Sequence, residues 1–182
     1  MRYYLDTEFH ETGTTIELIS IGIVAEDGRQ LYCESSEYDW SQASDWLKEN
    51  VKPHLWSQAK DKREFNAWIR DGNIGGLMPR NHIAIDVKRF CDPDIYGKPE
   101  FWGYYADYDW VVFCWLFGSM IALPKGFPMF CNDLKQDADR LGIRFPKMDA
   151  GEHHALSDAI WNKEMHEGYI LPNAQLKGVD RG

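Results

Sequence analysis

The sequence has no run of about 18 apolar residues, so no membrane-spanning helix is expected. Internal repeats, low-complexity tracts and a convincing linker are also absent, and 182 residues suit one domain, 1–182, with a sizeable core. The four cysteines show no C-x-x-C spacing, which is typical of reduced thiols. The opening MRYYLDTEF carries two acids, which interrupt any signal-peptide core. We therefore expect a cytoplasmic protein.

Basic residues are outnumbered by acidic ones. Lysine and arginine number 20 against 29 acidic residues, giving a net charge of −9. This balance argues against a passive nucleic-acid binder, whose affinity depends largely on lysine and arginine neutralising phosphates. An enzyme that meets phosphate through bound metal ions stays open, because the cation then dominates the local electric field.

Apolar and aromatic residues are plentiful, at 44% and 14% of the chain, and their pattern predicts a folded α/β domain. The first strands are expected at 2–9, 15–26 and 29–35, and Asp27-Gly28 is a good hairpin signal between the last two. These three strands predict an antiparallel meander within a mixed sheet flanked by helices. Further strands are expected at 100–105 and 127–132, and helices at 42–51, 61–71, 81–92, 109–120, 133–142 and 153–168. Gly72, Gly75, Gly76 and Pro79 predict a loop, and the last dozen residues a tail.

Two acids lie in the first strand, in the stretch LDTEF. Asp6 and Glu8 are two positions apart, so in a strand they share one face, roughly 6–7 Å apart. Carboxylates placed this way repel each other and resist burial. Either this face is open to water, or a positive charge lies between the two side chains.

Two further acids lie in apolar surroundings, Asp109 in YADYDWVVF and Asp158 in HHALSDAIW. Each has an ordinary structural explanation, since an Asp before a helix is most often an N-cap and an isolated Asp can lie on a solvated edge. Together, however, four acids suit a pair of Mg²⁺ or Mn²⁺ ions, which prefer oxygen ligands and lie about 3.5–4 Å apart in phosphoryl-transfer sites. The combination therefore favours a site for two divalent metal ions.

The stretches LDTEF, YADYD and HHALSDA, in this order, resemble the three motifs of the DEDDh 3′–5′ exonucleases. These enzymes have an RNase-H-like (DnaQ-like) fold and include RNase T and oligoribonuclease. ELISIGIV and YDWVVFCWLFG look most like the small bacterial exoribonuclease group of the mycobacterial polyadenylate-specific exoribonuclease. The resemblance covers nearly the whole chain.

The resemblance implies that Asp6, Glu8, Asp109 and Asp158 hold two Mg²⁺ or Mn²⁺ ions. Asp107 is then the better candidate for the helix N-cap. Tyr105 stands where the family usually has Asn or His, so this sequence departs from the family pattern at that position.

The doublet His153-His154 offers two candidates for the general base. On a regular helix His154, at i−4, would share a face with Asp158, and His153 would be rotated away. The resemblance instead implies that the histidine five residues before Asp158 lies on a loop entering the helix. We expect His153 to be the base and His154 to be exposed to solvent.

The implied reaction is hydrolysis of the terminal phosphodiester from the 3′ end, which releases nucleoside 5′-monophosphates. The resemblance implies a substrate of single-stranded RNA or an RNA 3′ overhang, and a homodimer. Phe9 is a candidate for stacking on the terminal base and Ser20 for contacting the terminal nucleotide. The alternatives are a DNA-directed 3′–5′ exonuclease, a glycosidase that uses Asp6 and Glu8, and a non-catalytic nucleic-acid-binding module.

Overall fold

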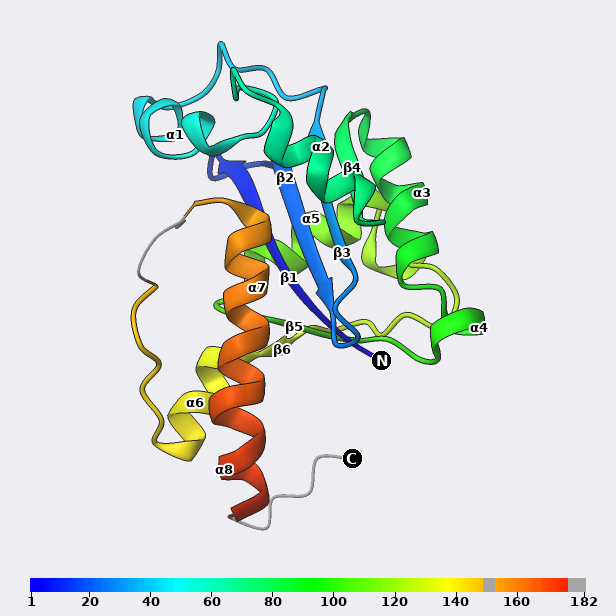
Figure 1. Cartoon of the computed structure of the whole chain (residues 1–182), viewed down its shortest axis with the longest axis vertical. Helices are drawn as coiled ribbons and strands as arrows, with labels where there is room; N and C mark the ends of the chain where they lie inside the picture. The colour runs from blue at the N-terminus through cyan, green and yellow to red at the C-terminus, as the bar shows by residue number, and fades with distance from the viewer. Residues whose placement is uncertain (149–152, 177–182) are drawn as a thin grey trace.

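A computed structural model describes residues 1–148 and 153–176 (Figure 1). Its strands are β1 (Arg2–Glu11), β2 (Ile16–Ala25), β3 (Gln30–Ser35), β4 (Ile74–Met78), β5 (Glu100–Gly103) and β6 (Asn132–Asp133). Its helices are α1 (Asp45–Asn50), α2 (Arg63–Arg70), α3 (Arg80–Phe90), α4 (Pro93–Tyr96), α5 (Asp107–Leu116), α6 (Leu134–Leu141), α7 (Ala155–Met165) and α8 (Leu171–Leu176). Two 3-10 turns, η1 (Lys52–His54) and η2 (Met120–Ala122), and a π-helical turn, η3 (His166–Ile170), complete the described elements.

The strands form one six-stranded mixed sheet in the order β4-β3-β2-β1-β5-β6. β1, β2 and β3 pair antiparallel, whereas β4, β5 and β6 each join a neighbour in parallel. The predicted N-terminal meander and the mixed α/β class are therefore confirmed. The Asp27-Gly28 turn closes the second hairpin, with Gly28 at φ 93° and its N–H donating to the carbonyl of Ala25 at 3.0 Å.

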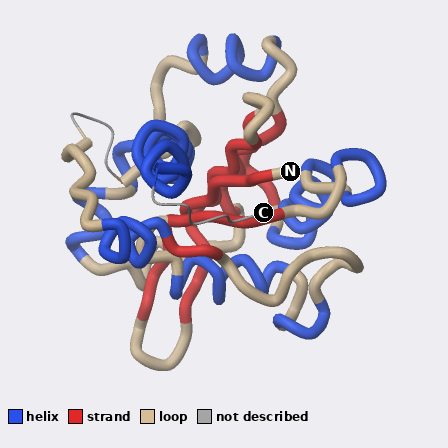
Figure 2. Tube along the Cα trace, turned by 90° about the horizontal axis from the view of Figure 1, so that it is seen from below, coloured by secondary structure: helices blue, strands red, loops and turns tan. Residues whose placement is uncertain are grey.

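Helices cover both faces of the sheet (Figures 1 and 2). On one face α3 and α5 pack against the main core, where Tyr3, Leu5 and Phe101 are fully buried. On the opposite face the first turns of α7 pack against β2 and β3. Because side chains alternate along a strand, Tyr3 and Leu5 face α3 and α5, whereas Asp6 and Glu8 face α7. None of the helices in the two described ranges has the length and apolar character needed to cross a membrane.

The predicted loop over Gly72–Pro79 is wrong, because Ile74–Met78 forms the edge strand β4. β4 pairs in parallel with β3, and Gly75 lies opposite Tyr32. A Cβ atom on Gly75 would lie only 1.8 Å from the Tyr32 carbonyl oxygen. The glycine that suggested a loop is therefore what permits the close pairing of these two strands.

Other boundaries also differ from the prediction, most of all in β6 and in the final helix. Of the predicted strand over 127–132 only Asn132 is in a strand, the two-residue β6 (Asn132–Asp133), and Pro128, which has no N–H to donate to a sheet, lies outside it. The final helix continues from α7 through η3 into α8. Residues 171–176 are therefore helical rather than a tail, and 177–182 lie outside the described residues.

A candidate metal centre and active site

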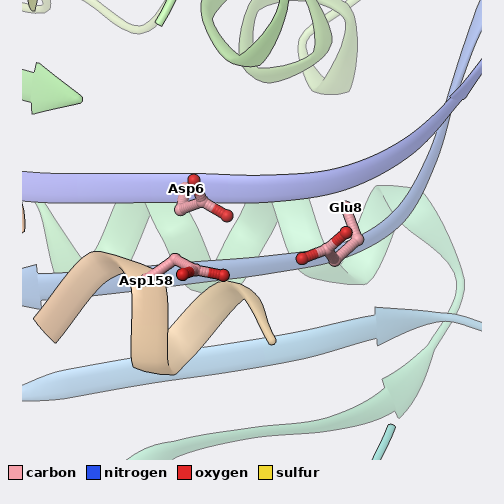
Figure 3. Close-up of side chains that lie close together, drawn as sticks. All are labelled: Asp6, Glu8 and Asp158. Carbon is pink, nitrogen blue, oxygen red and sulfur yellow. The ribbon is translucent and has the colours of Figure 1, made fainter. Parts of the chain in front are cut away.

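Three of the predicted acids meet on the α7 face of the sheet. Asp6 and Glu8 point from β1 toward Asp158 in the first turn of α7 (Figure 3). One carboxylate oxygen from each of the three side chains lies within 4.8 Å of the other two. This spacing brings three hard oxygen donors within reach of a common divalent cation.

The electrostatics of this cluster are unfavourable without a cation. Burial raises the pKa of Asp6 well above its ordinary range, and the charges of Asp109, Asp158 and Glu8 raise it further. Burial, followed by repulsion from Asp158 and Asp109, raises the pKa of Glu8 to about 8. These carboxyl groups therefore resist losing their protons together. A divalent cation would reverse that preference, so the donor set fits such an ion.

Asp109 reaches the same site from α5, on the opposite face of the sheet. Its Oδ1 accepts hydrogen bonds from the Thr7 N–H at 2.8 Å and the Thr7 hydroxyl at 2.6 Å. Burial raises the pKa of Asp109 to about 6, although both Thr7 hydrogen bonds lower it. Since Thr7 occupies Oδ1, the other oxygen, Oδ2, is the atom available to a ligand. Asp109 is not within the group formed by Asp6, Glu8 and Asp158.

The prediction that Asp107 caps α5 is wrong. The helix begins at Asp107, and its N-cap is Ala106, which has no side-chain cap. The N–H of Ala106 donates instead to Asp133 Oδ2 at 2.8 Å. Asp107 is an exposed residue of the first helical turn, where a negative charge favours the helix dipole.

Gly22 allows α7 to approach the sheet closely enough to deliver Asp158. Gly22 lies opposite Asp6 in the β1–β2 ladder. A Cβ atom there would come within 2.3 Å of the Ala155 carbonyl oxygen. The amide of Asn162, one helical turn beyond Asp158, donates to the Leu5 carbonyl at 3.0 Å and holds the helix against β1.

His153 precedes α7 and lines the same hollow as the four acids. Its backbone has a φ of 67°, the left-handed conformation that non-glycine residues rarely adopt. Tyr105, the other non-glycine residue with positive φ in the described ranges, lines this hollow too. Such strained positions concentrate at functional sites. The His153 ring also lies edge-on to Trp46 of α1, with 4.9 Å between ring centroids.

The expectation that His154 is exposed to solvent is wrong. His154 is the N-cap of α7, its side chain accepting from the Ser157 N–H, and only 8% of its surface is exposed. Its ring stacks on Tyr32 at 4.5 Å, and burial lowers its pKa to about 4. The backbone N–H of His154 donates to Asp158 Oδ2 at 3.2 Å, so His154 supports the site through its backbone. His154 has the extended backbone of an N-cap and His153 a left-handed one, so the side-chain positions of a regular helix apply to neither.

The two predicted substrate contacts differ in position. Phe9 is partly buried, lines the hollow of the acids, and stacks on Tyr108 at 5.9 Å. Ser20, opposite Glu8 in the ladder, is fully buried. The Ser20 hydroxyl has no hydrogen-bond partner among the described residues. Its position therefore does not favour direct contact with a substrate.

A second hollow adjoins the acids on the other side of Asp6 and Asp158. We call it the aromatic hollow, because Tyr104, Phe145 and Trp161 line it together with Lys147. The first, the histidine-side hollow, is lined by Phe9, Tyr105 and His153 beside the four acids. Tyr104, Asp6 and Asp158 line both, and each hollow encloses about 290 Å³.

Fold and site together define a mixed α/β protein with a carboxylate cluster suited to divalent metal ions. The family model described as the 3′–5′ exoribonuclease Rv2179c-like domain matches residues 1–170. Two Mycobacterium tuberculosis proteins, the 3′–5′ exoribonucleases MT2234.1 (strain CDC 1551 / Oshkosh) and Rv2179c (strain H37Rv), are each 39% identical over 160 residues. Each match covers 87% of this chain and 87% of the relative. The chain belongs to the Rv2179c-like 3′–5′ exoribonuclease family, and the prediction of a 3′–5′ exonuclease is confirmed.

Proposed function

We propose that the protein is a metal-dependent 3′–5′ exoribonuclease of the DEDDh type, with an RNase-H-like fold, that releases nucleoside 5′-monophosphates. The observation that carries this proposal is the convergence of Asp6, Glu8 and Asp158 within 4.8 Å. With a net charge of −9, the chain as a whole offers little attraction to phosphate, which favours a site that meets phosphate through metal ions. Family membership supports RNA as the substrate.

Asp6, Glu8, Asp109 and Asp158 would hold two Mg²⁺ or Mn²⁺ ions. When bound, such ions supply positive charge that makes water more acidic and stabilises the leaving 3′ oxygen. Thr7 fixes the orientation of Asp109 through two hydrogen bonds, so that this carboxylate needs little rearrangement on binding. Gly22 sets the separation between Asp158 and the β1 acids.

His153 would act as the general base. His153 lies outside the helix and lines the hollow of the acids. The N-cap of α7 is His154, so the His153 ring is not used for capping. In the reaction a water oxygen bonds to the terminal phosphorus while the bond from phosphorus to the 3′ oxygen breaks. His153 would take the water proton, and the departing chain would keep the 3′ oxygen, which becomes a hydroxyl by taking a proton from solvent.

Phe9 would stack on the base of the terminal nucleotide, since it borders the acids on the histidine side. We include a single-stranded RNA or RNA 3′ overhang as substrate, a cytoplasmic location and a homodimer in the proposal. These parts rest on the likeness of the motifs and on the family.

Product analysis tests the proposal. Matched RNA and DNA oligomers of one sequence, incubated with Mn²⁺ and separated by chromatography, should yield nucleoside 5′-monophosphates, and faster from RNA. EDTA should stop the release. Faster DNA hydrolysis would favour a DNA exonuclease, and nucleoside 3′-monophosphates would contradict the proposed cleavage of the bond between phosphorus and the 3′ oxygen.

A further inference from the structure

The aromatic hollow has the features of a base-binding surface beside the acids. The rings of Tyr104, Phe145 and Trp161 lie in mutual contact, with centroid separations of 5.2–5.9 Å. All three rings are partly buried, so each keeps some surface open. Aromatic side chains grouped in this way bind single-stranded nucleic acids by stacking on successive bases.

A positive charge accompanies these rings. Lys147 is exposed and lines the aromatic hollow. Among the described residues that line either hollow, it is the single lysine or arginine. In a chain of net charge −9, a lysine placed beside three aromatic rings suits a nucleotide, which offers a base for stacking and a phosphate for the ammonium group.

The position of His153 decides which nucleotide each hollow takes. In an in-line displacement the attacking water and the leaving oxygen lie on opposite sides of the phosphorus. His153 lines the histidine-side hollow and does not line the aromatic one, and the two hollows meet at Asp6 and Asp158. If the water is deprotonated on the His153 side, the leaving 3′ oxygen and the nucleoside that carries it lie on the far side.

We propose that the aromatic hollow binds the penultimate nucleotide of the RNA, with Phe145 and Trp161 against its base and Lys147 beside a phosphate. This assignment rests on the proposed function. The scissile phosphate then lies over Asp6 and Asp158, and the terminal nucleotide occupies the histidine-side hollow beside Phe9. The volume of about 290 Å³ on each side is at the lower end of the range for ligand sites, about 300–1,000 Å³, and suits one nucleotide per hollow.

The test uses RNA pentamers that lack one base. The wild-type enzyme should hydrolyse a pentamer with an abasic penultimate residue about 5- to 150-fold more slowly than the intact pentamer, the size of one lost stacking contact. Phe145→Ala should be slow on the intact pentamer and should lose little more when the penultimate base is removed. An abasic 3′-terminal residue serves as the control and should slow both enzymes by the same factor.

Lys147→Gln provides a variant at an exposed position, where the fold is not at risk. A plot of log(kcat/KM) against log[salt] should have a negative slope, and in this variant the slope should be smaller in magnitude by about 0.7. That is the change expected for one lost phosphate contact on a single strand. Lys125→Gln, an exposed lysine that lines neither hollow, is the matched control and should leave the slope unchanged.

The outcomes separate the two proposals. Failure of the wild-type enzyme to hydrolyse the intact pentamer would overturn the proposed function and this assignment with it. Normal hydrolysis with no penalty for the missing penultimate base would overturn the assignment alone. The assignment would also be overturned if Phe145→Ala lost its sensitivity to removal of the terminal base rather than of the penultimate base.

Discussion

Replacing Glu8 with glutamine should stabilise the protein when metal is absent. In the folded state burial and neighbouring acids raise the pKa of Glu8 from 4.5 to about 8. The folded state therefore holds this proton more tightly than the unfolded state. The stability that this proton provides is fully present below about pH 4.5 and is lost as the pH rises toward 8. Glutamine is neutral throughout and avoids this loss.

The size of the effect follows from the pKa difference. At about 1.4 kcal/mol per pKa unit, the rise from 4.5 to about 8 corresponds to about 4 kcal/mol at pH 8. For a protein of this length 1 kcal/mol shifts Tm by about 2–4 °C, so the Tm of Glu8→Gln should exceed that of the wild type by about 10 °C at pH 8. The difference should shrink to near zero at pH 4.5.

Thermal unfolding followed by circular dichroism, in EDTA and across pH 4.5–8, measures this effect. Glu49→Gln, at an exposed position on α1, is the matched control and should change Tm little at any pH. Mn²⁺ at 100 times Kd should narrow the difference between Glu8→Gln and the wild type, because the wild type gains about 2.7 kcal/mol of binding energy that the glutamine variant lacks. A Tm unchanged by Glu8→Gln at pH 8 in EDTA would refute the reasoning.

The remaining predictions concern turnover. Asp6→Asn should abolish hydrolysis of labelled RNA while leaving the circular dichroism spectrum intact, and near-wild-type activity would contradict the metal-ligand role. His153→Ala should lower kcat by about 10²–10⁴ while binding Mn²⁺ as before in calorimetry. His154→Ala should instead lower Tm, because it removes a buried stack and an N-cap worth about 1 kcal/mol or more, and a larger kcat loss here than in His153→Ala would reverse the assignment. Asp109→Asn should eliminate metal-dependent activity, whereas Asp107→Asn should cost little; the opposite pattern of rates would place the motif two residues earlier.

Local patterns predicted those parts of the fold that depend on local interactions. The meander of β1, β2 and β3 follows from apolar strands and an Asp-Gly turn, both of which are visible in the sequence. The shared face of Asp6 and Glu8 follows from strand geometry alone. Convergence with Asp158 required a partner 150 residues away in the chain, so the order of the three motifs, rather than local chemistry, indicated it.

The features that sequence reasoning missed depend on tertiary contacts. β4 was not predicted because the need for Gly75 arises from the Tyr32 carbonyl of a neighbouring strand. Gly22 gave a weak signal, since a glycine inside a strand pattern often marks a close backbone approach. Thr7 gave none, because its role is set by Asp109 on another element.

The burial of His154 could not be predicted from the doublet itself. The left-handed backbone at His153 separates the two side chains, sending one toward the acids and the other under the first turn of α7. The rings that cover His154, Tyr32 and Trp56, come from distant segments of the chain. The two adjacent histidines therefore have different environments because of tertiary contacts, which cannot be predicted from residue spacing or composition.

The central claim is that the four acids hold metal ions that drive hydrolysis from the 3′ end of RNA. The most direct measurement follows 5′-labelled RNA at single-nucleotide resolution while Mn²⁺ is titrated into metal-free enzyme, with Asp6→Asn in parallel. The account predicts a ladder that shortens one nucleotide at a time, appears only as Mn²⁺ is added, and is absent in the variant. Shortening in EDTA, internal cuts without a ladder, or an active Asp6→Asn enzyme would contradict it.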